Sequence, residues 1–262
     1  MDFHRLAILF ANLWPKLNIF HFIKMKIVIV PYRDRIEHLT FFQTYLPTVL
    51  SDYELMVVHQ RDFRPFNRGA MKNIGFLAVK QKYPDQYRDA TLIFQDVDIM
   101  PYKTGIFDYE AEHGVIHHFY GYESCLSACF AIKGADFERS NGFPNLWEWG
   151  VEDYMMQERV LKSGCRIDRT HFYPVGSRQV LQFFDGMHRS MSTLNVDQIK
   201  ARHAFDGITS LNSEFKFDGV FVQVSHFTTM YPPTNSVMVR DIREIGVNKQ
   251  IKKTWNFPFN LR

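Results

Sequence analysis

Short apolar runs alternate with segments of helical periodicity in the N-terminal part of the chain. Runs of β-branched and other apolar residues predict buried strands over residues 26–31, 54–59 and 91–94. Between them, apolar residues recur at helical spacing over residues 36–50 and 67–83. Strands that alternate with helices in this way are typical of an α/β domain whose sheet is largely parallel and flanked by helices.

Further along the chain the pattern is less regular but continues in the same style. It predicts a helix over residues 153–163 and strands over residues 115–119, 128–132, 219–224 and 237–241. No internal repeat, low-complexity tract or linker interrupts it. We therefore expect one domain over residues 25–262.

Residues 1–24 precede the first predicted strand as an N-terminal extension. Their apolar stretch, residues 6–23, is interrupted by Pro15 and several polar side chains, which argues against a firm membrane span. No small-residue cleavage site follows it, so it is a poor secretory signal peptide. We expect a cytosolic protein, with a Golgi or membrane-associated location through residues 1–24 as the alternative.

Composition narrows the class of protein. Hydrophobic residues make up 46% and charged residues 23%, which excludes a disordered or fibrous chain. The net charge of +3 comes without a long basic run, so we expect no nucleic-acid partner. Three cysteines are too few for a disulfide framework or a four-cysteine zinc site, which fits a reducing compartment.

Chemically distinctive residues follow the predicted strands, where open α/β sheets bind ligands. Arg33 and Arg35 follow the first strand, and their guanidinium groups suit a diphosphate, although a surface ion-pair cluster explains them as well. Phe66, Asn67 and Arg68 open the second helix and offer a ring, an amide and a charge near a helix N-terminus. Asn67 is equally well explained as an ordinary N-cap.

The third loop is acidic. Asp96, Val97 and Asp98 follow an apolar strand, where carboxylates are costly unless they are paired or metal-bound. We expect at most one of the two carboxylates to contact a metal directly, unless the chain turns there. Oxygen ligands favour Mn²⁺ or Mg²⁺ beside a nucleotide diphosphate.

Residues 141–153, NGFPNLWEWGVED, are the most distinctive segment. Glu152 and Asp153 open a predicted helix, whose dipole stabilises carboxylates in the first turn; that is the purely structural explanation. The preceding Trp147 and Trp149 suggest instead a sugar platform beside a carboxylate that accepts a proton from a hydroxyl.

Taken together, these motifs resemble those of the β-1,4-galactosyltransferases and of the related chondroitin-synthase-type N-acetylgalactosaminyltransferases. VPYRDR, FNRGAMKNIGF, QDVDIMP and NGFPNLWEWGVED occur in family order, and the resemblance covers roughly residues 26–230. It implies the GT-A fold, a Rossmann-like nucleotide-sugar transferase domain. It also implies an inverting, metal-dependent transfer of a hexose from a UDP-sugar to a hydroxyl of a glycan acceptor.

The resemblance assigns roles to individual residues. Asp153 resembles the catalytic base, with Glu152 beside it at the acceptor hydroxyl. Asp98 and His188 resemble ligands of Mn²⁺, with Mg²⁺ as the alternative; Asp185 stands where the family often has a methionine ligand. The residues that match donor contacts of the family are Arg33, Arg35, Phe66, Arg68, Val97, Trp149 and Cys125.

Two departures from the family pattern leave the substrates open. Cys125 aligns near a tyrosine that lines the donor-sugar pocket of galactose-specific members, and a small residue there leaves room for an N-acetyl group. UDP-galactose is thus the expected donor and UDP-N-acetylgalactosamine the alternative. Tyr154 stands where the family often has a third acid, so the acceptor is not assigned.

A non-catalytic nucleotide- or glycan-binding module is the alternative from another class of protein. Such a module keeps the fold, but the loss of catalysis usually removes the acids. The presence of Asp98, Glu152, Asp153 and His188 together favours an enzyme.

Overall fold

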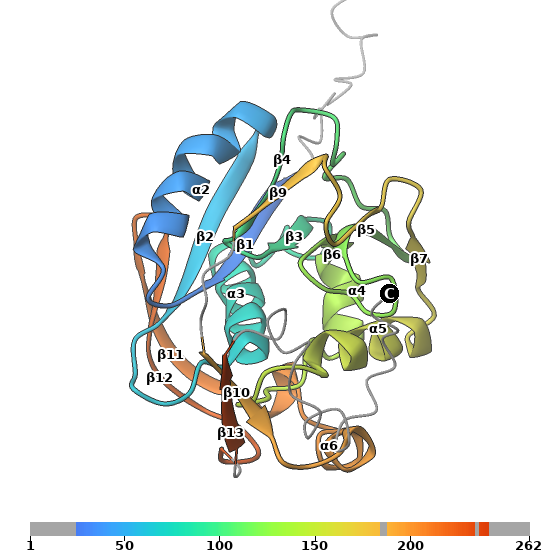
Figure 1. Cartoon of the computed structure of the whole chain (residues 1–262). Helices are drawn as coiled ribbons and strands as arrows, with labels where there is room; N and C mark the ends of the chain where they lie inside the picture. Colours follow the sequence, from blue (N-terminus) through green and yellow to red (C-terminus); the bar gives the residue numbers. More distant parts are fainter. Residues whose placement is uncertain (1–24, 184–187, 234–235, 241–262) are drawn as a thin grey trace, which may run out of the picture.

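A mixed sheet runs through the centre of the molecule (Figure 1). The computed structural model describes residues 25–183, 188–233 and 236–240. Within them, nine strands form the sheet: β1 (Lys26–Tyr32), β2 (Tyr53–Gln60), β3 (Thr91–Gln95), β5 (Val115–Gly121), β6 (Cys129–Lys133), β7 (Arg166–Asp168), β8 (Tyr173–Pro174), β11 (Asn212–Asp218) and β12 (Phe221–Thr228). Their order is β11-β12-β2-β1-β3-β6-β5-β7, with β8 beside β5.

Helices and two small strand pairs surround the sheet. The helices are α2 (Ile36–Val49), α3 (Arg68–Lys82), α4 (Gly134–Arg139), α5 (Glu152–Lys162), α6 (Val196–Arg202) and the 3₁₀ turn η1 (Ile208–Ser210). The pairs are β4 (Ile99–Pro101) with β9 (Val180–Gln182), and β10 (His188–Ser192) with β13 (Ser236–Arg240). No helix of the described residues has both the length and the apolar character needed to cross a membrane.

The strand directions decide where loops gather. β1 is parallel to both β2 and β3, β12 is parallel to β2, and β7 and β8 are parallel to β5. Only β11 and β6 pair antiparallel within this described sheet, β6 with both of its neighbours. The prediction of a largely parallel sheet is therefore confirmed. Because β6 is reversed, the loop that precedes it lies at the same edge as the loops that follow β1, β2 and β3.

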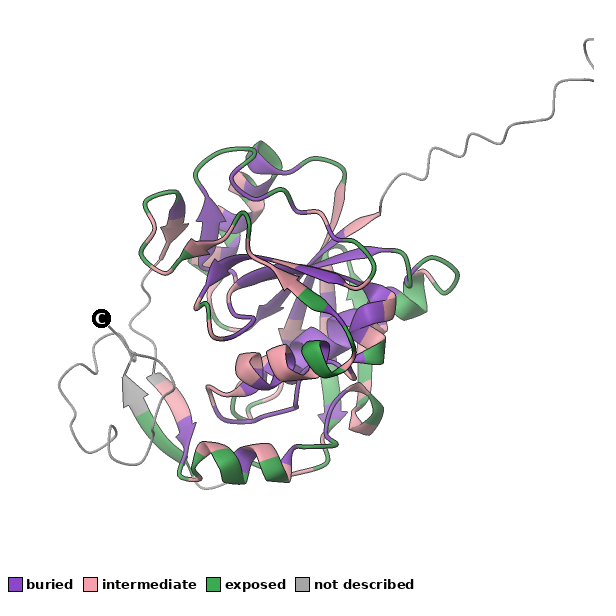
Figure 2. Cartoon of the chain, turned by 90° about the vertical axis from the view of Figure 1, so that its right-hand side faces the viewer, coloured by how far each residue is buried: buried purple, intermediate pink, exposed green. Residues whose placement is uncertain are grey.

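Both faces of the sheet are covered, which explains why its strands are apolar throughout rather than alternating. Ile27 and Ile29 of β1 belong to a core shared with α3, α4 and α5. Val28 and Val30 belong to a second core with α2. Figure 2 shows the buried strands between these layers and the exposed outer faces of the helices. The sheet is therefore stabilised by two hydrophobic cores, one packed against each of its faces.

The predicted strands and helices are all present, most with ends within two residues of the expected ones. The sequence analysis missed α4, α6, β7, β8, β11 and three strands of the short pairs, β4, β9 and β10; β13 is the strand expected over residues 237–241. β11 is an edge strand whose residues are largely exposed, so no apolar run marks it. α6 is a short helix that begins with a capping box, in which Asn195 and Gln198 bond each other's backbone N–H groups.

Candidate active site

A cleft of about 550 Å³ opens at the sheet edge where these loops gather. Its lining includes every described residue to which the family resemblance assigned a site role, namely Arg33, Arg35, Phe66, Arg68, Val97, Asp98, Cys125, Trp149, Glu152 and Asp153. Asp185 lies outside the described residues, and so does the side chain of His188, whose backbone begins β10. The two predicted metal assignments to them therefore stay predictions.

One wall of the cleft is formed by the loop after β1 and the loop after β2. The guanidinium of Arg33 lies 5.4 Å from the centroid of the Phe66 ring and donates a hydrogen bond to the Arg64 carbonyl at 2.5 Å. Arg33 also contacts Asp34 at 3.6 Å, so the surface ion pair that the sequence suggested is present as well. This wall offers a flat ring and a cation side by side, which suits a base and a phosphate.

β3 ends at Gln95, and the loop after it turns at Val97 and Asp98, which is the turn that the expectation for this loop allowed. Both carboxylates consequently line the same cleft. Asp96 accepts two hydrogen bonds from Nη2 of Arg68, each 2.8 Å long. Asp98 is 7% exposed, and its Oδ2 lies 3.5 Å from Nη1 of Arg35. Both acids thus pair with an arginine, Asp96 with Arg68 and Asp98 with Arg35, and the metal contact predicted for Asp98 stays a prediction.

Arg68 connects three carboxylates from two distant loops. Besides Asp96, its Nη1 contacts Glu152 at 2.9 Å and Asp153 at 2.8 Å. Burial lowers the pKa of Arg68, but the charges of Asp153, Asp96 and Glu152 outweigh it and raise that pKa well above its ordinary value. Burial raises the pKa of Asp96, but the charges of Arg68, Lys72 and Arg35 and the hydrogen bonds from Arg68 together outweigh it, so the pKa of Asp96 falls. The donor contact predicted for Arg68 stays a prediction, and holding the acids is a second use of this side chain.

The acid pair opens α5 after a strained turn. Gly150 and Val151 have φ values of 96° and 73°, in the left-handed region that a β-branched residue rarely adopts. This turn brings Glu152 and Asp153 into the cleft as the first two residues of the helix. Strain of this kind costs about 1–3 kcal/mol and is typical of functional sites.

The two acids differ in environment. The Glu152 side chain is 5% exposed and that of Asp153 is 16% exposed. Oε2 of Glu152 has no hydrogen-bond partner among the described residues. Burial, and then the charge of Asp153, raise the pKa of Glu152 despite Arg68. Asp153 is the more accessible acid, with cations on one side of it and the cleft on the other.

Lys72 is a site residue that the sequence analysis missed. It is fully buried, and its Nζ lies 3.4 Å from Oδ1 of Asp153 and 4.5 Å from the centroid of the Phe143 ring. Burial, and then the charge of Arg68, lower the pKa of Lys72. Its position one helical turn after Arg68 was the available signal, because residues i and i+4 share a helix face.

The two tryptophans have different surroundings. Trp147 is 3% exposed, stacks on Phe227 at a centroid distance of 5.1 Å, and has the Arg64 guanidinium 4.6 Å from its ring centroid. The expectation that it forms a sugar platform is therefore wrong, because other side chains cover its ring. Trp149 is only half-buried and faces the cleft, with the Arg189 guanidinium 5.3 Å from its ring centroid. Trp149 alone of the pair remains available as a platform.

Cys125 lies in the cleft wall on the loop before β6. It is 4% exposed, and burial, with a contribution from the charge of Asp153, raises the pKa of its thiol to about 12. The thiol is consequently protonated and a poor nucleophile at neutral pH. Its part in the cleft is that of a small side chain.

Asp98 is the described residue for which the sequence predicts a contact with a hard divalent cation. No group of three or more ligating side chains occurs among the described residues. Asp98 offers a nearly buried carboxylate at the cleft, and oxygen donors of this kind suit Mn²⁺ and Mg²⁺. The chemistry of the Asp98 carboxylate thus fits one ligand of such a cation. Further ligands are expected from Asp185 and His188.

Comparison with known proteins identifies relatives over most of the chain. A model described as the N-terminal region of glycosyl transferase group 7 matches residues 21–107, and one described as the N-terminal domain of galactosyltransferase matches residues 111–182. β-1,4-Galactosyltransferase 2 of Cricetulus griseus is 30% identical over 205 residues, which are 70% of this chain and 53% of the relative. Xylosylprotein 4-β-galactosyltransferase of Caenorhabditis elegans is 27% identical over 176 residues, 62% of this chain and 59% of the relative. The chain therefore spans about half the length of the curated relatives it matches.

A solved structure shares the fold. A mutant of Drosophila β-1,4-galactosyltransferase 7, in complex with manganese, UDP-Gal and xylobiose, superimposes with a TM-score of 0.65 at 18% identity, covering 84% of this chain and 96% of that one. At this identity the likeness establishes the GT-A-type fold. The two family models together match more than half of the sequence and include all four motif loops around the cleft. The chain belongs to group 7 of the glycosyl transferases, the family of the β-1,4-galactosyltransferases.

Proposed function

We propose that this chain is an inverting, metal-dependent glycosyltransferase that moves galactose from UDP-galactose to a hydroxyl of a glycan acceptor. The observation that carries the proposal is the position of Asp153 at the head of α5, in the same cleft as the Arg33–Phe66 wall and Asp98. A base, a wall suited to a nucleotide and a carboxylate suited to a metal thus share one space. The galactosyltransferase relatives support the same activity.

Binding of the donor is assigned to the loops after β1 and β2. Phe66 offers its ring to the uracil base, and Arg33 and Arg35 offer guanidinium groups to the diphosphate. Trp149, half-buried in the lining of the same cleft, is assigned to the sugar face. These contacts orient the anomeric carbon of the bound UDP-sugar toward Glu152 and Asp153, because the residues assigned to the donor and the two acids line the same cleft.

Asp153 is assigned the role of base. The acceptor oxygen forms a bond to the anomeric carbon, the bond from that carbon to the β-phosphate oxygen breaks, and the electron pair leaves with UDP. The acceptor proton passes to the Asp153 carboxylate. Glu152 is less suited to this role, because its side chain is more buried than that of Asp153 and therefore less accessible to an acceptor hydroxyl.

When bound, a Mn²⁺ or Mg²⁺ ion supplies Lewis-acid stabilisation of the leaving diphosphate. Asp98 would hold it together with His188 and Asp185. Arg35, 3.5 Å from Asp98, is near enough to neutralise the same diphosphate from the protein side.

UDP-N-acetylgalactosamine is a second candidate donor, favoured by one observation. Cys125 is a small side chain in the cleft wall, where a tyrosine would occupy space that an N-acetyl group needs. The acceptor is less constrained. A xyloside is the first one to test, because the C. elegans relative is named as a xylosylprotein galactosyltransferase and the Drosophila structure contains xylobiose.

The test is a panel of UDP-sugars with Mn²⁺, measured as sugar transferred to xylosides, N-acetylglucosaminides and other simple glycosides. We expect transfer from UDP-galactose that stops when the metal is chelated. Binding of UDP without transfer to any acceptor of the panel, and without hydrolysis of any donor, would favour the non-catalytic module instead.

Two further proposals concern the chain as a whole. We propose that residues 25–262 form a single domain, to be tested by limited proteolysis of the full chain, which should leave one resistant fragment.

We also propose a cytosolic location, with membrane association through residues 1–24 as the alternative. Fractionation of cells that express the full chain distinguishes the two locations.

A further inference from the structure

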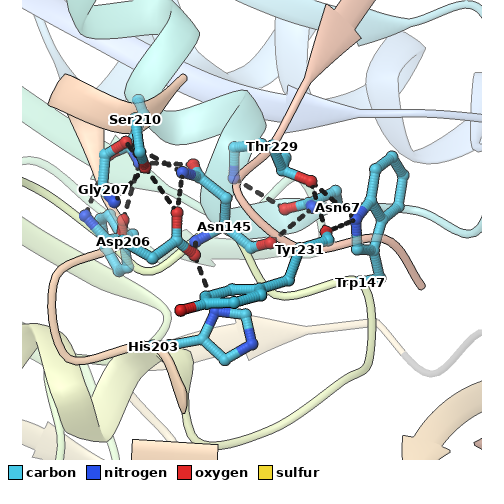
Figure 3. Close-up of polar contacts among 12 residues, drawn as sticks. Asn67, Asn145, Trp147, His203, Asp206, Gly207, Ser210, Thr229 and Tyr231 are labelled. Atoms are coloured by element: carbon cyan, nitrogen blue, oxygen red, sulfur yellow. Dashed lines mark hydrogen bonds and ion pairs between the residues drawn. The ribbon is translucent and has the colours of Figure 1, made fainter. Parts of the chain in front are cut away.

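Asp206 is a buried carboxylate outside the cleft with an unusually complete set of hydrogen-bond donors (Figure 3). It is 0% exposed. Its Oδ2 accepts from the backbone N–H of Asn145 at 2.8 Å and from Nδ1 of His203 at 2.7 Å. Its Oδ1 accepts from Nδ2 of Asn145 and from Oγ of Ser210, both at 2.7 Å. Four donors around one carboxylate fix its position, and they fix the positions of the donors as well.

Asn145 transmits this order toward the cleft. Its carbonyl accepts from Nδ2 of Asn67 at 3.0 Å, and its Oδ1 accepts from Nδ2 of Asn73 at 2.9 Å. Its Nδ2 donates to the Gly207 carbonyl at 2.9 Å in addition to Asp206. Every polar group of Asn145 is thus engaged, on one side with Asp206 and its loop and on the other with α3.

Asn67 and Arg68 are the residues that this arrangement positions. Asn67 caps α3 by accepting from the backbone N–H of Ala70 at 2.9 Å, and Arg68 is the first residue of that helix. The chain that continues from Asn145 carries Trp149 and then the acid pair. The N-terminus of α3 and the segment 141–151 also approach closely, since a Cβ on Gly69 would lie 2.2 Å from the Pro144 carbonyl oxygen.

We propose that Asp206 is a positioning residue for the acid pair: through Asn145 it holds the segment 141–151 against the N-terminus of α3, so that Arg68 meets Glu152 and Asp153. Asp206 itself does not line the cleft and touches none of the groups assigned to substrate. This inference rests on the proposed function, because it concerns how the assigned base is held. A misplacement of reacting groups by about 1 Å can cost on the order of 10²-fold in rate.

The experiment compares Asp206→Asn with Asp136→Asn in the full chain. In wild type the four donors face carboxylate oxygens. An asparagine at position 206 presents an amide N–H₂ group to some of these donors, so that hydrogen bonds are lost. Asp136 is the matched control: it is 1% exposed, accepts from the Gly114 backbone N–H at 2.7 Å and pairs with Arg139 at 2.7 Å, but it does not line the cleft. Both variants lose hydrogen bonds to a buried carboxylate, so both should lower the melting temperature.

We expect the two variants to separate in kinetics. In Asp206→Asn, kcat should fall by about 10²-fold, while KM for UDP-galactose stays near the wild-type value because the Arg33–Phe66 wall is untouched. In Asp136→Asn, kcat should be unchanged. Equal changes of kcat in the two variants would overturn the positioning role and leave Asp206 a purely structural residue.

Hydrogen–deuterium exchange gives a readout that needs no activity. Backbone amides of residues 141–151 should exchange faster in Asp206→Asn than in wild type, and those around α4 should not. If wild type transfers no sugar at all, the proposed function fails, and exchange still decides whether Asp206 holds this segment. Unchanged exchange there would overturn the inference. If Asp206→Asn does not fold, Ser210→Ala, which removes one of the four donors, should give the same changes on a smaller scale.

Discussion

Nη1 of Arg68 lies 2.8 Å from both carboxylate oxygens of Asp153, although the two residues are 85 positions apart in the chain. The contact joins the start of α3 to the start of α5. It makes the assigned base part of an ion-pair network with Asp96 and Glu152. The site is therefore organised around a cation supplied by the protein, in addition to any metal.

Asp153→Asn tests the base. The substitution keeps the size of the side chain and removes the proton acceptor, so kcat should fall by about 10²–10⁴-fold. Affinity for UDP, measured by calorimetry, should stay near the wild-type value. Glu158→Gln, on the same helix but paired with Lys200 at 2.6 Å, is the control and should retain full activity. Full turnover in Asp153→Asn would remove it as the base and direct attention to Glu152.

Arg68→Met tests the ion-pair network. It leaves three carboxylates without their shared cation, and breaking a buried pair in this way costs about 3–5 kcal/mol of unfolding free energy. Arg88→Met is the control, since Arg88 is a largely exposed partner of Glu138 and such surface pairs contribute about 0–1 kcal/mol.

The pH dependence of that loss follows from the pKa of Asp96, which Arg68 lowers against the effect of burial. A depressed carboxylate pKa stabilises the fold above the unfolded value, about 3.9, and this contribution is lost as pH falls through the folded pKa. The difference in unfolding free energy between wild type and Arg68→Met should thus be large at pH 7 and shrink below about pH 4. A difference that does not vary with pH in urea titrations would contradict this account.

Asp98→Ala tests the metal site. Removing the carboxylate at the turn after β3 should abolish the Mn²⁺-dependent part of UDP binding measured by calorimetry, as chelation of the metal does in wild type. Asp85→Ala removes an exposed acid beyond the end of α3 and should change nothing. Unaltered Mn²⁺-dependent affinity in Asp98→Ala would show that the metal binds elsewhere.

Asp185→Met addresses the metal preference. Carboxylate oxygens are harder ligands than a thioether, so the substitution should reduce activity with Mg²⁺ relative to Mn²⁺. The measurement is the ratio of initial rates with each metal at saturation. An unchanged ratio would mean that Asp185 does not contact the ion.

Cys125→Tyr tests the donor pocket. A phenol ring in place of a small buried thiol should exclude the N-acetyl group, and the ratio of kcat/KM for UDP-galactose to that for UDP-N-acetylgalactosamine should rise by more than about tenfold. Cys125→Ala keeps the side chain small and should leave the ratio as it is. An equal response of both donors to Cys125→Tyr would place Cys125 away from the transferred sugar.

Local pattern was sufficient for much of the architecture. The buried run of β1, the helical periodicity of α2 and α3 and the acidic loop after β3 are all visible in the sequence, because burial on two faces requires continuous apolar strands and a helix requires spacing of 3.6 residues. The parallel order then implied that the loops after β1, β2 and β3 meet at one edge. Glu152 and Asp153 were identified from the tryptophans that precede them and from the family resemblance of the segment NGFPNLWEWGVED.

Only the tertiary structure decided how these side chains are used. Local pattern does not distinguish Asp96 from Asp98, or Trp147 from Trp149; in the sequence only the family resemblance singles out Asp98 and Trp149. The difference is that Arg68 binds Asp96, while Phe227 and Arg64 cover the ring of Trp147. The sequence analysis likewise assigned no role to Lys72 or Asp206, because each depends on partners far away in the chain. Periodicity reports which side of an element is buried, whereas pairing of charges and hydrogen bonds depends on distances across the fold that no local pattern contains.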